Sequence, residues 1–160
     1  MYKRILVPVD GSHTSTLGLS EAIKLSKAEG AKLRLIHVVD DLIMSGGFDG
    51  ATDYAGDIIE TLRVGGKSIL KTAEVRVQRA GLNSESVMLE HFGAHAAALI
   101  VEDAKKWKAD LIVLGTHGRR GIKRLVMGSD AEEIVRTSPV PILLVRSKSP
   151  GESAARKRNR

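Results

Sequence analysis

The sequence predicts a single α/β domain built as a doubly wound, mostly parallel five-stranded sheet with four helices. Five short apolar runs alternate along the chain with four segments of helical pattern. The chain has 160 residues, of which 42% are hydrophobic, enough for one domain with a substantial core. Cysteine is absent, which excludes disulfides and thiolate metal sites and fits a cytoplasmic protein.

The first half of the chain opens with an apolar, β-branched run, "RILVPV" at residues 4–9, which Asp10 and Gly11 close as a turn. A helical pattern follows and stops at Gly30, and "KLRLIHVV" at residues 32–39 predicts the second strand. Glycine and aspartate then gather at residues 40–56, where neither the strand period nor the helix period holds. We interpret that segment as a long loop.

A long helical pattern covers residues 57–81, and the pair Gly65-Gly66 in its middle predicts a kink. The third strand is expected at residues 86–92, and the third helix is expected from Ala94 onward. Because neighbouring strands are joined by helical segments, consecutive strands should run parallel.

The fourth strand is predicted at residues 109–115, "ADLIVLG". A helix should then run from Ser129 to Thr137, with Ser129 as its N-cap and acidic residues in its first turn. Pro139 and Pro141 bracket the start of the last strand, which predicts that this strand lies at a sheet edge.

The net charge of +6 belongs to the end of the chain. Residues 146–160 carry six Lys or Arg and one Glu, which leaves 19 basic and 18 acidic side chains in the rest. We therefore divide the chain into a domain at residues 1–146 and a basic, disordered tail at residues 147–160. With 3% aromatic residues there is little for bases to stack on, so a nucleic-acid partner is not expected. No apolar run reaches the ~18 residues of a membrane span.

The loop after the fourth predicted strand is the main candidate for a binding site. Gly115 and Gly118 allow close approach of the backbone, and Gly128-Ser129 opens a helix with free amides, an arrangement that can hold phosphate. A solvated glycine-rich loop explains the same residues equally well. The chain lacks GxGxxG, and "VGGKS" at residues 64–68 lacks the first glycine of the other common phosphate loop.

The loop after the first predicted strand is the second candidate. Asp10 could accept hydrogen bonds from a ribose or bind Mg²⁺, or could simply hold the turn. His37 is expected to be packed within its strand, while His117 lies in the loop after the fourth predicted strand, which we call the glycine loop. The histidines show no metal-site spacing. We find no pair of carboxylates marked as acid and base, so no catalytic residue is predicted.

Four segments together resemble the universal stress protein family: "ILVPVDGS", "LIHVVD", "ADLIVLGTHGRRGIKRLVMGSDAEEIV" and "SPVPILLVR". The ATP-binding subgroup of that family has a pattern of Gly, two residues, Gly, nine residues, Gly and Ser or Thr. Gly115, Gly118, Gly128 and Ser129 fill it with that spacing. The resemblance implies a Rossmann-like fold of the adenine nucleotide alpha hydrolase type and ATP as ligand, with Mg²⁺ or Mn²⁺.

Carried over by position, the resemblance places Pro8 and Asp10 beside the ribose and the backbone of Val38 at the adenine. It assigns the phosphates to nine residues, which are Gly115, Thr116, His117, Gly118, Arg119, Arg120, Gly121, Gly128 and Ser129, followed by Asp130 and Ala131 in the helix. It also implies a homodimer formed by pairing the last strand, Val140 to Val145. Residues 45–56, Gly65-Gly66 and the basic tail depart from the family pattern, which leaves the protein partner unknown.

Two functions fit these features. The first is a regulatory module in the stress response, in which bound ATP changes a surface read by a protein partner. The alternative is a slow ATPase or autophosphorylating enzyme with Ser129 or Thr116 as the acceptor, which is disfavoured because no general base is evident.

Overall fold

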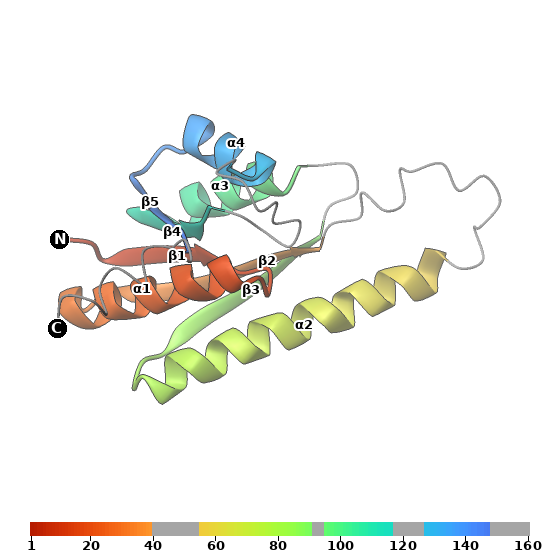
Figure 1. Ribbon diagram of the computed structural model, residues 1–160, viewed down its shortest axis with the longest axis horizontal. Helices are drawn as coiled ribbons and strands as arrows, with labels where there is room; N and C mark the ends of the chain where they lie inside the picture. The colour runs from red at the N-terminus through yellow and green to blue at the C-terminus, as the bar shows by residue number, and fades with distance from the viewer. Residues whose placement is uncertain (40–54, 91–94, 117–126, 148–160) are drawn as a thin grey trace, which may run out of the picture.

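The computed structural model describes residues 1–39, 55–90, 95–116 and 127–147. Strands and helices alternate along this part of the chain, which confirms the predicted fold class (Figure 1). In order, the elements are β1 (Arg4–Pro8), α1 (His13–Glu29), β2 (Lys32–Val39), α2 (Ala55–Arg79), β3 (Ser84–Glu90), α3 (Ala96–Trp107), β4 (Leu111–Gly115), α4 (Ser129–Thr137) and β5 (Ile142–Val145).

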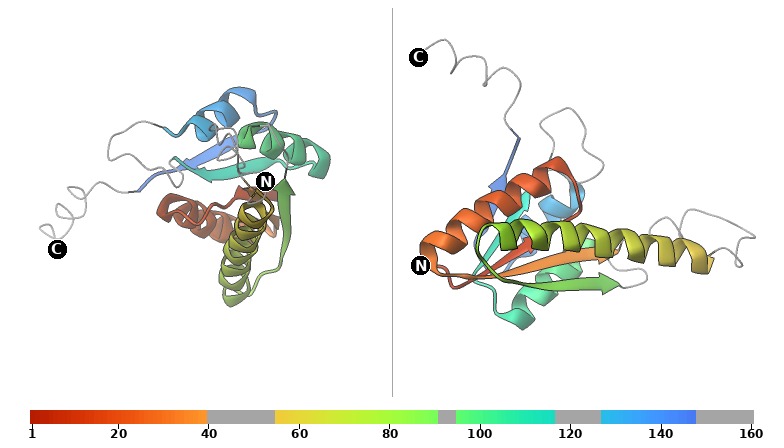
Figure 2. Two further views of the ribbon diagram at one scale, coloured as in Figure 1. Left: turned by 90° about the vertical axis from the view of Figure 1, so that its right-hand side faces the viewer. Right: turned by 90° about the horizontal axis from the view of Figure 1, so that it is seen from below.

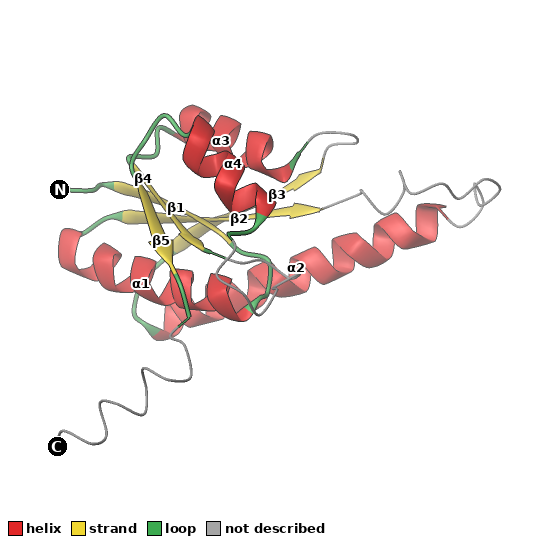
Figure 3. Cartoon of the chain, turned by 45° about the horizontal axis from the view of Figure 1, so that its top comes forward, coloured by secondary structure: helices red, strands yellow, loops and turns green. Residues whose placement is uncertain are grey.

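The sheet has the strand order β3-β2-β1-β4-β5, and every neighbouring pair is parallel (Figure 3). Ile5 of β1 stands in register with Leu33 of β2 on one side and with Leu111 of β4 on the other. The chain builds outward from β1 in one direction and then returns to build in the other. The order therefore reverses between β1 and β4, and β5 lies at an edge, as its prolines predicted.

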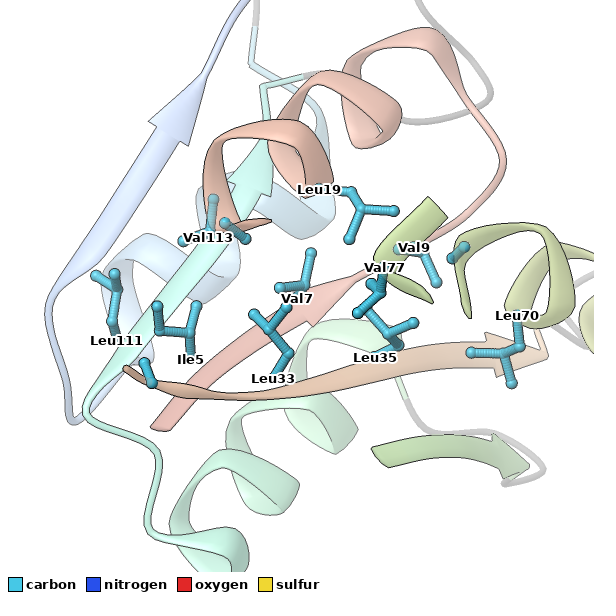
Figure 4. Packing of buried hydrophobic residues seen from close by; sticks show 13 residues of the cluster. Ile5, Val7, Val9, Leu19, Leu33, Leu35, Leu70, Val77, Leu111 and Val113 are labelled. Atoms are coloured by element: carbon cyan, nitrogen blue, oxygen red, sulfur yellow. The ribbon is translucent and has the colours of Figure 1, made fainter. Parts of the chain in front are cut away.

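Helices cover both faces of the sheet. α1 and α2 lie on one face, and α3 and α4 lie on the other (Figures 1 and 2). The pleat of β1 divides its side chains between two cores: Ile5 and Val7 pack with α1 and α2 (Figure 4), whereas Leu6 packs with α3 and α4. All three side chains have no exposed surface, so β1 is the centre of the domain.

The kink predicted at Gly65-Gly66 is wrong, because α2 runs from Ala55 to Arg79 as one uninterrupted helix (Figure 1). Gly66 is buried, and a Cβ atom there would lie 2.7 Å from His37 Cδ2 and 3.1 Å from Met88 Sδ. Gly66 therefore allows α2 to pack closely on β2 and β3. Gly65 faces open space.

Several element boundaries differ from the prediction, including the start of β4, which is Leu111 and not residue 109. β3 begins at Ser84 and not at residue 86, because its backbone already pairs with Leu33 of β2 there, whatever the polarity of its side chains. α3 begins at Ala96, with His95 as its N-cap. The N-cap of α4 is Gly128, which makes Ser129 the first helical residue.

A network of charged side chains joins β2 and β3 to α3 near the amino-terminal ends of these strands. The Arg34 guanidinium contacts Asp103 at 3.0 Å and Glu85 at 2.7 Å, and it lies over the Trp107 ring at 5.0 Å. Burial opposes the charge of Arg34, but the hydrogen bonds to Glu85 and Asp103 outweigh burial and raise its pKa. The hydrogen bond from Arg34 lowers the pKa of the Glu85 carboxyl.

The lowered pKa of Glu85 predicts a small loss of stability in acid. A carboxyl with a lowered folded pKa stabilises the fold above its ordinary value of 4.5, and this contribution disappears as the pH falls through the lowered value. At pH 7, Glu85→Gln should reduce the free energy of unfolding by about 1 kcal/mol or less, because the side chain is half exposed. Urea unfolding at pH 7 and pH 3.5 should show this difference shrinking in acid. An equal difference at both pH values would contradict the lowered pKa of Glu85. Glu133→Gln, which lies outside the network, is the control.

Candidate functional site

The turn that follows β1 is held by a set of short-range hydrogen bonds. Asp10 Oδ1 accepts a hydrogen bond from the backbone N–H of Ser12 at 2.9 Å, and the Ser12 hydroxyl accepts one from the N–H of Ser15 at 3.1 Å. Ser12 is thus the N-cap of α1. Gly11 between them has a φ of +81°, a conformation that glycine adopts without strain. The sequence Asp-Gly-Ser therefore fixes Asp10 at the carboxyl end of β1.

The end of β4 lies against the first turn of α1, and two glycines make this approach possible. A Cβ atom on Gly115 would lie 2.6 Å from the Thr14 carbonyl carbon and 2.9 Å from the Ser15 nitrogen. A Cβ atom on Gly18 would lie 3.3 Å from the Gly115 nitrogen. The contact brings the start of the glycine loop beside the turn that carries Asp10.

Both ends of the glycine loop are anchored at this place. The Thr116 N–H donates to the Val145 carbonyl at 2.9 Å, and the Gly128 N–H donates to the Thr116 carbonyl at 2.9 Å. Gly128 has extended backbone angles and leads directly into α4. The N–H groups in the first turn of an α-helix have no acceptor within the helix, so the start of α4 at Ser129 is suited to an anion.

The remaining predicted positions lie at the same edge of the sheet. Pro8 ends β1 and stands in register with Ile36 of β2, and Val38 lies two residues beyond that pair. Both Pro8 and Val38 are half-buried. The carboxyl ends of β2, β1 and β4 thus place Val38, Asp10 and Gly115 on three adjacent strands, at and beside the point where strand order reverses.

Five of the predicted site residues lie outside the described part of the chain: His117, Gly118, Arg119, Arg120 and Gly121. His37, predicted to be packed, is 5% exposed, and its Nδ1 lies 2.7 Å from the Val9 carbonyl oxygen. Within residues 1–39, 55–90, 95–116 and 127–147, no three His, Asp or Glu side chains gather closely enough to hold a metal ion. In the same residues, no helix has the length and apolar character needed to cross a membrane.

The residues that sequence reasoning missed are those of α1 that face β4. Thr14 and Ser15 are both 7% exposed, and Gly18 is buried beside them. The run "TSTLG" at residues 14–18, small except for Leu17, was the signal that this turn packs closely against another backbone. These residues set the distance between the Asp10 turn and the glycine loop.

The family model described as Universal stress protein family matches residues 1–146. The chain belongs to the universal stress protein family. It is 35% identical over 147 residues to Universal stress protein MJ0531 of Methanocaldococcus jannaschii, a match that covers 91% of this chain and 83% of that protein.

Solved structures of the family share the fold. Universal stress protein UspA from Lactobacillus plantarum superposes with a TM-score of 0.78 at 26% identity, covering 91% of this chain and 98% of that one. A universal stress protein solved in complex with cAMP superposes with a TM-score of 0.66 at 25% identity, covering 92% of this chain and 99% of that one.

Proposed function

We propose that this protein is an ATP-binding regulatory module of the stress response, in which bound nucleotide orders the glycine loop and changes a surface read by a protein partner. The observation that carries the proposal is the anchoring of both loop ends, Thr116 and Gly128, beside the Asp10 turn at the point where strand order reverses. A 25% identical member of the family was solved with cAMP, an adenine nucleotide, which supports the class of ligand.

The residues at this edge fit the parts of ATP. Asp10, beside Pro8, is proposed to accept hydrogen bonds from the ribose hydroxyls, and the backbone of Val38 is proposed to meet the adenine. The amides of Ser129, Asp130 and Ala131 are proposed to bind phosphate together with Gly115, Thr116 and the loop residues. Mg²⁺ or Mn²⁺ would neutralise the triphosphate, and the Asp10 carboxylate and Ser129 hydroxyl are oxygen ligands of the kind these ions take.

Calorimetric titration with MgATP tests the proposal. The wild-type protein should bind saturably, and Gly128→Val should weaken binding about tenfold or more. Valine tolerates the extended angles of Gly128, with φ −64° and ψ 149°, so its side chain should obstruct the ligand without straining the backbone. Gly65→Ala, an exposed glycine change in the middle of α2, is the matched control and should bind as wild type does.

No heat and no saturation with folded wild-type protein would exclude the ATP function. Binding by Gly128→Val that equals the wild type would exclude the glycine loop as the phosphate site. Titrations with AMP and cAMP under the same conditions separate a preference for the triphosphate from binding of adenine nucleotides in general.

We further propose that the protein forms a homodimer through residues Val140 to Val145. β5 is an edge strand, and Leu143 and Leu144 are each 37% exposed on it. An apolar edge strand offers unpaired backbone groups and apolar surface to a second copy. Native mass spectrometry of the purified protein reports the number of chains and any retained nucleotide together. The cysteine-free composition supports action in the cytoplasm.

A further inference from the structure

A groove of about 290 Å³ lies between α1 and α2, on the sheet face that these two helices cover. Its apolar lining comes from three elements: Val9 just after β1, Leu19 of α1, and Ile69 and Ala73 of α2. Val9 and Leu19 are visible between the two helices in Figure 4. The groove borders the Asp10 turn, since Gly11 and Ser15 line one end of it, but none of Gly115, Thr116, Gly128 or Ser129 does.

One wall of the groove is polar. Ser68, Thr72 and Arg76 are spaced four residues apart on α2, so they follow one another along one face of the helix. Thr16 of α1 adds a hydroxyl from the opposite side. The Thr72 hydroxyl donates to the Ser68 carbonyl at 2.9 Å, so its oxygen can still accept a hydrogen bond.

Arg76 is the charged member of this row. Among the described residues, Arg34 and Arg63 each form ion pairs with carboxylates at 2.7 to 3.0 Å, whereas no Asp or Glu in that part of the chain lies within 4.0 Å of the Arg76 guanidinium. A guanidinium offers paired donors that match a carboxylate. Arg76 is exposed, and it places a cation that no carboxylate of the described residues pairs with beside an apolar floor.

We propose that the groove between α1 and α2 is a binding site for a small amphipathic carboxylate, with the carboxylate on Arg76 and the aliphatic body on Val9, Leu19 and Ala73. The hydroxyls of Thr16 and Ser68 are available to the second carboxylate oxygen or to a polar substituent. The volume is at the small end of the roughly 300–1,000 Å³ found for ligand pockets, which suits a ligand of a few carbon atoms. This site adjoins the proposed nucleotide site at Gly11 and Ser15, but the proposal does not rest on nucleotide binding.

The test is an NMR titration of the full-length, ¹⁵N-labelled protein with sodium hexanoate at pH 7, without nucleotide. Hexanoate should shift the amides of Leu19 and Ala73 saturably. Arg76→Gln should raise the dissociation constant about tenfold, the usual effect of losing a charge-assisted hydrogen bond. Arg79→Gln removes an exposed charge one turn later on α2, outside the groove, and should leave the dissociation constant unchanged.

Three further measurements make the proposal specific. Hexan-1-ol and inorganic phosphate should each bind at least tenfold more weakly than hexanoate. Hexan-1-ol lacks the anionic group, and phosphate lacks the aliphatic chain. Thr72→Phe, at an exposed position on the polar wall, should fill the groove and abolish the saturable shifts while the protein stays folded. Absence of saturable shifts in wild type, equal weakening by Arg76→Gln and Arg79→Gln, or binding of either half-ligand as tight as that of hexanoate would overturn the proposal.

Discussion

Replacing Gly115 by alanine should lower the free energy of unfolding by about 2 to 3 kcal/mol. The added Cβ would lie 2.6 Å from the Thr14 carbonyl carbon, 2.7 Å from its oxygen and 2.9 Å from the Ser15 nitrogen. All three atoms belong to the backbone, which cannot rotate away as a side chain can. β4 and α1 would have to separate, and the buried contacts on both sides of Gly115 would be lost.

Urea unfolding followed by circular dichroism measures this loss of stability. Alanine substitutions at two other glycines provide the comparison. Gly18→Ala should cost less, since its Cβ would meet the Gly115 nitrogen at 3.3 Å. Gly56→Ala should cost nothing, because open space surrounds that position in the first turn of α2. An unfolding midpoint for Gly115→Ala equal to that of Gly56→Ala would show that the contact between β4 and α1 is not as tight as the geometry indicates.

The adjacent glycines of α2 should respond to alanine with opposite signs. Gly65→Ala should stabilise the protein by about 0.5 to 1 kcal/mol, because alanine favours the helix and nothing lies within 4 Å of the new methyl group. Gly66→Ala gains the same helix propensity, but its methyl group would meet His37 Cδ2 at 2.7 Å. His37 must then move and weaken its contact with the Val9 carbonyl, for a net loss of about 1 to 2 kcal/mol.

Thermal or urea unfolding of the two variants side by side is the measurement, and each is the matched control of the other. Changes of the same sign would contradict the account of α2 packing on β2. A change at Gly66 should also disturb the end of β1 next to Asp10, since Val9 is the residue that His37 contacts. The Gly66→Ala protein should therefore show altered amide shifts at Asp10, and the Gly65→Ala protein should not.

The alternation of apolar runs and helical patterns was enough to predict the order of the elements. Hydrophobic periodicity and the turn residues that end each element are local properties of the sequence. Gly65-Gly66 shows where this reasoning fails. Helix propensity treats the two residues alike, yet one faces solvent and the other faces His37, a residue brought there by the sheet. Packing between elements that are distant in sequence determines how each glycine is surrounded, and local sequence rules cannot predict such packing.

The candidate site divides in the same way. Asp10 and the glycine loop could be located from the sequence because strands end there and carboxyl ends of parallel strands share one edge. Pro8 and Val38 were assigned only through the family resemblance, since nothing in their own residue types marks them. The close approach of Gly115 to Thr14 joins positions about a hundred residues apart, and it needed the structure.

The hydrogen bond from the Gly128 N–H to the Thr116 carbonyl has a consequence for how this family can vary in sequence. Thr116 and Gly128 are joined directly, so the positions of β4 and α4 do not depend on the number of residues between them. Doubling such a segment costs only about 0.6 kcal/mol of closure entropy. Insertions or deletions there should be tolerated by the fold. The fold therefore does not require the nine residues that separate Gly118 from Gly128. We expect that ligand binding fixes this number.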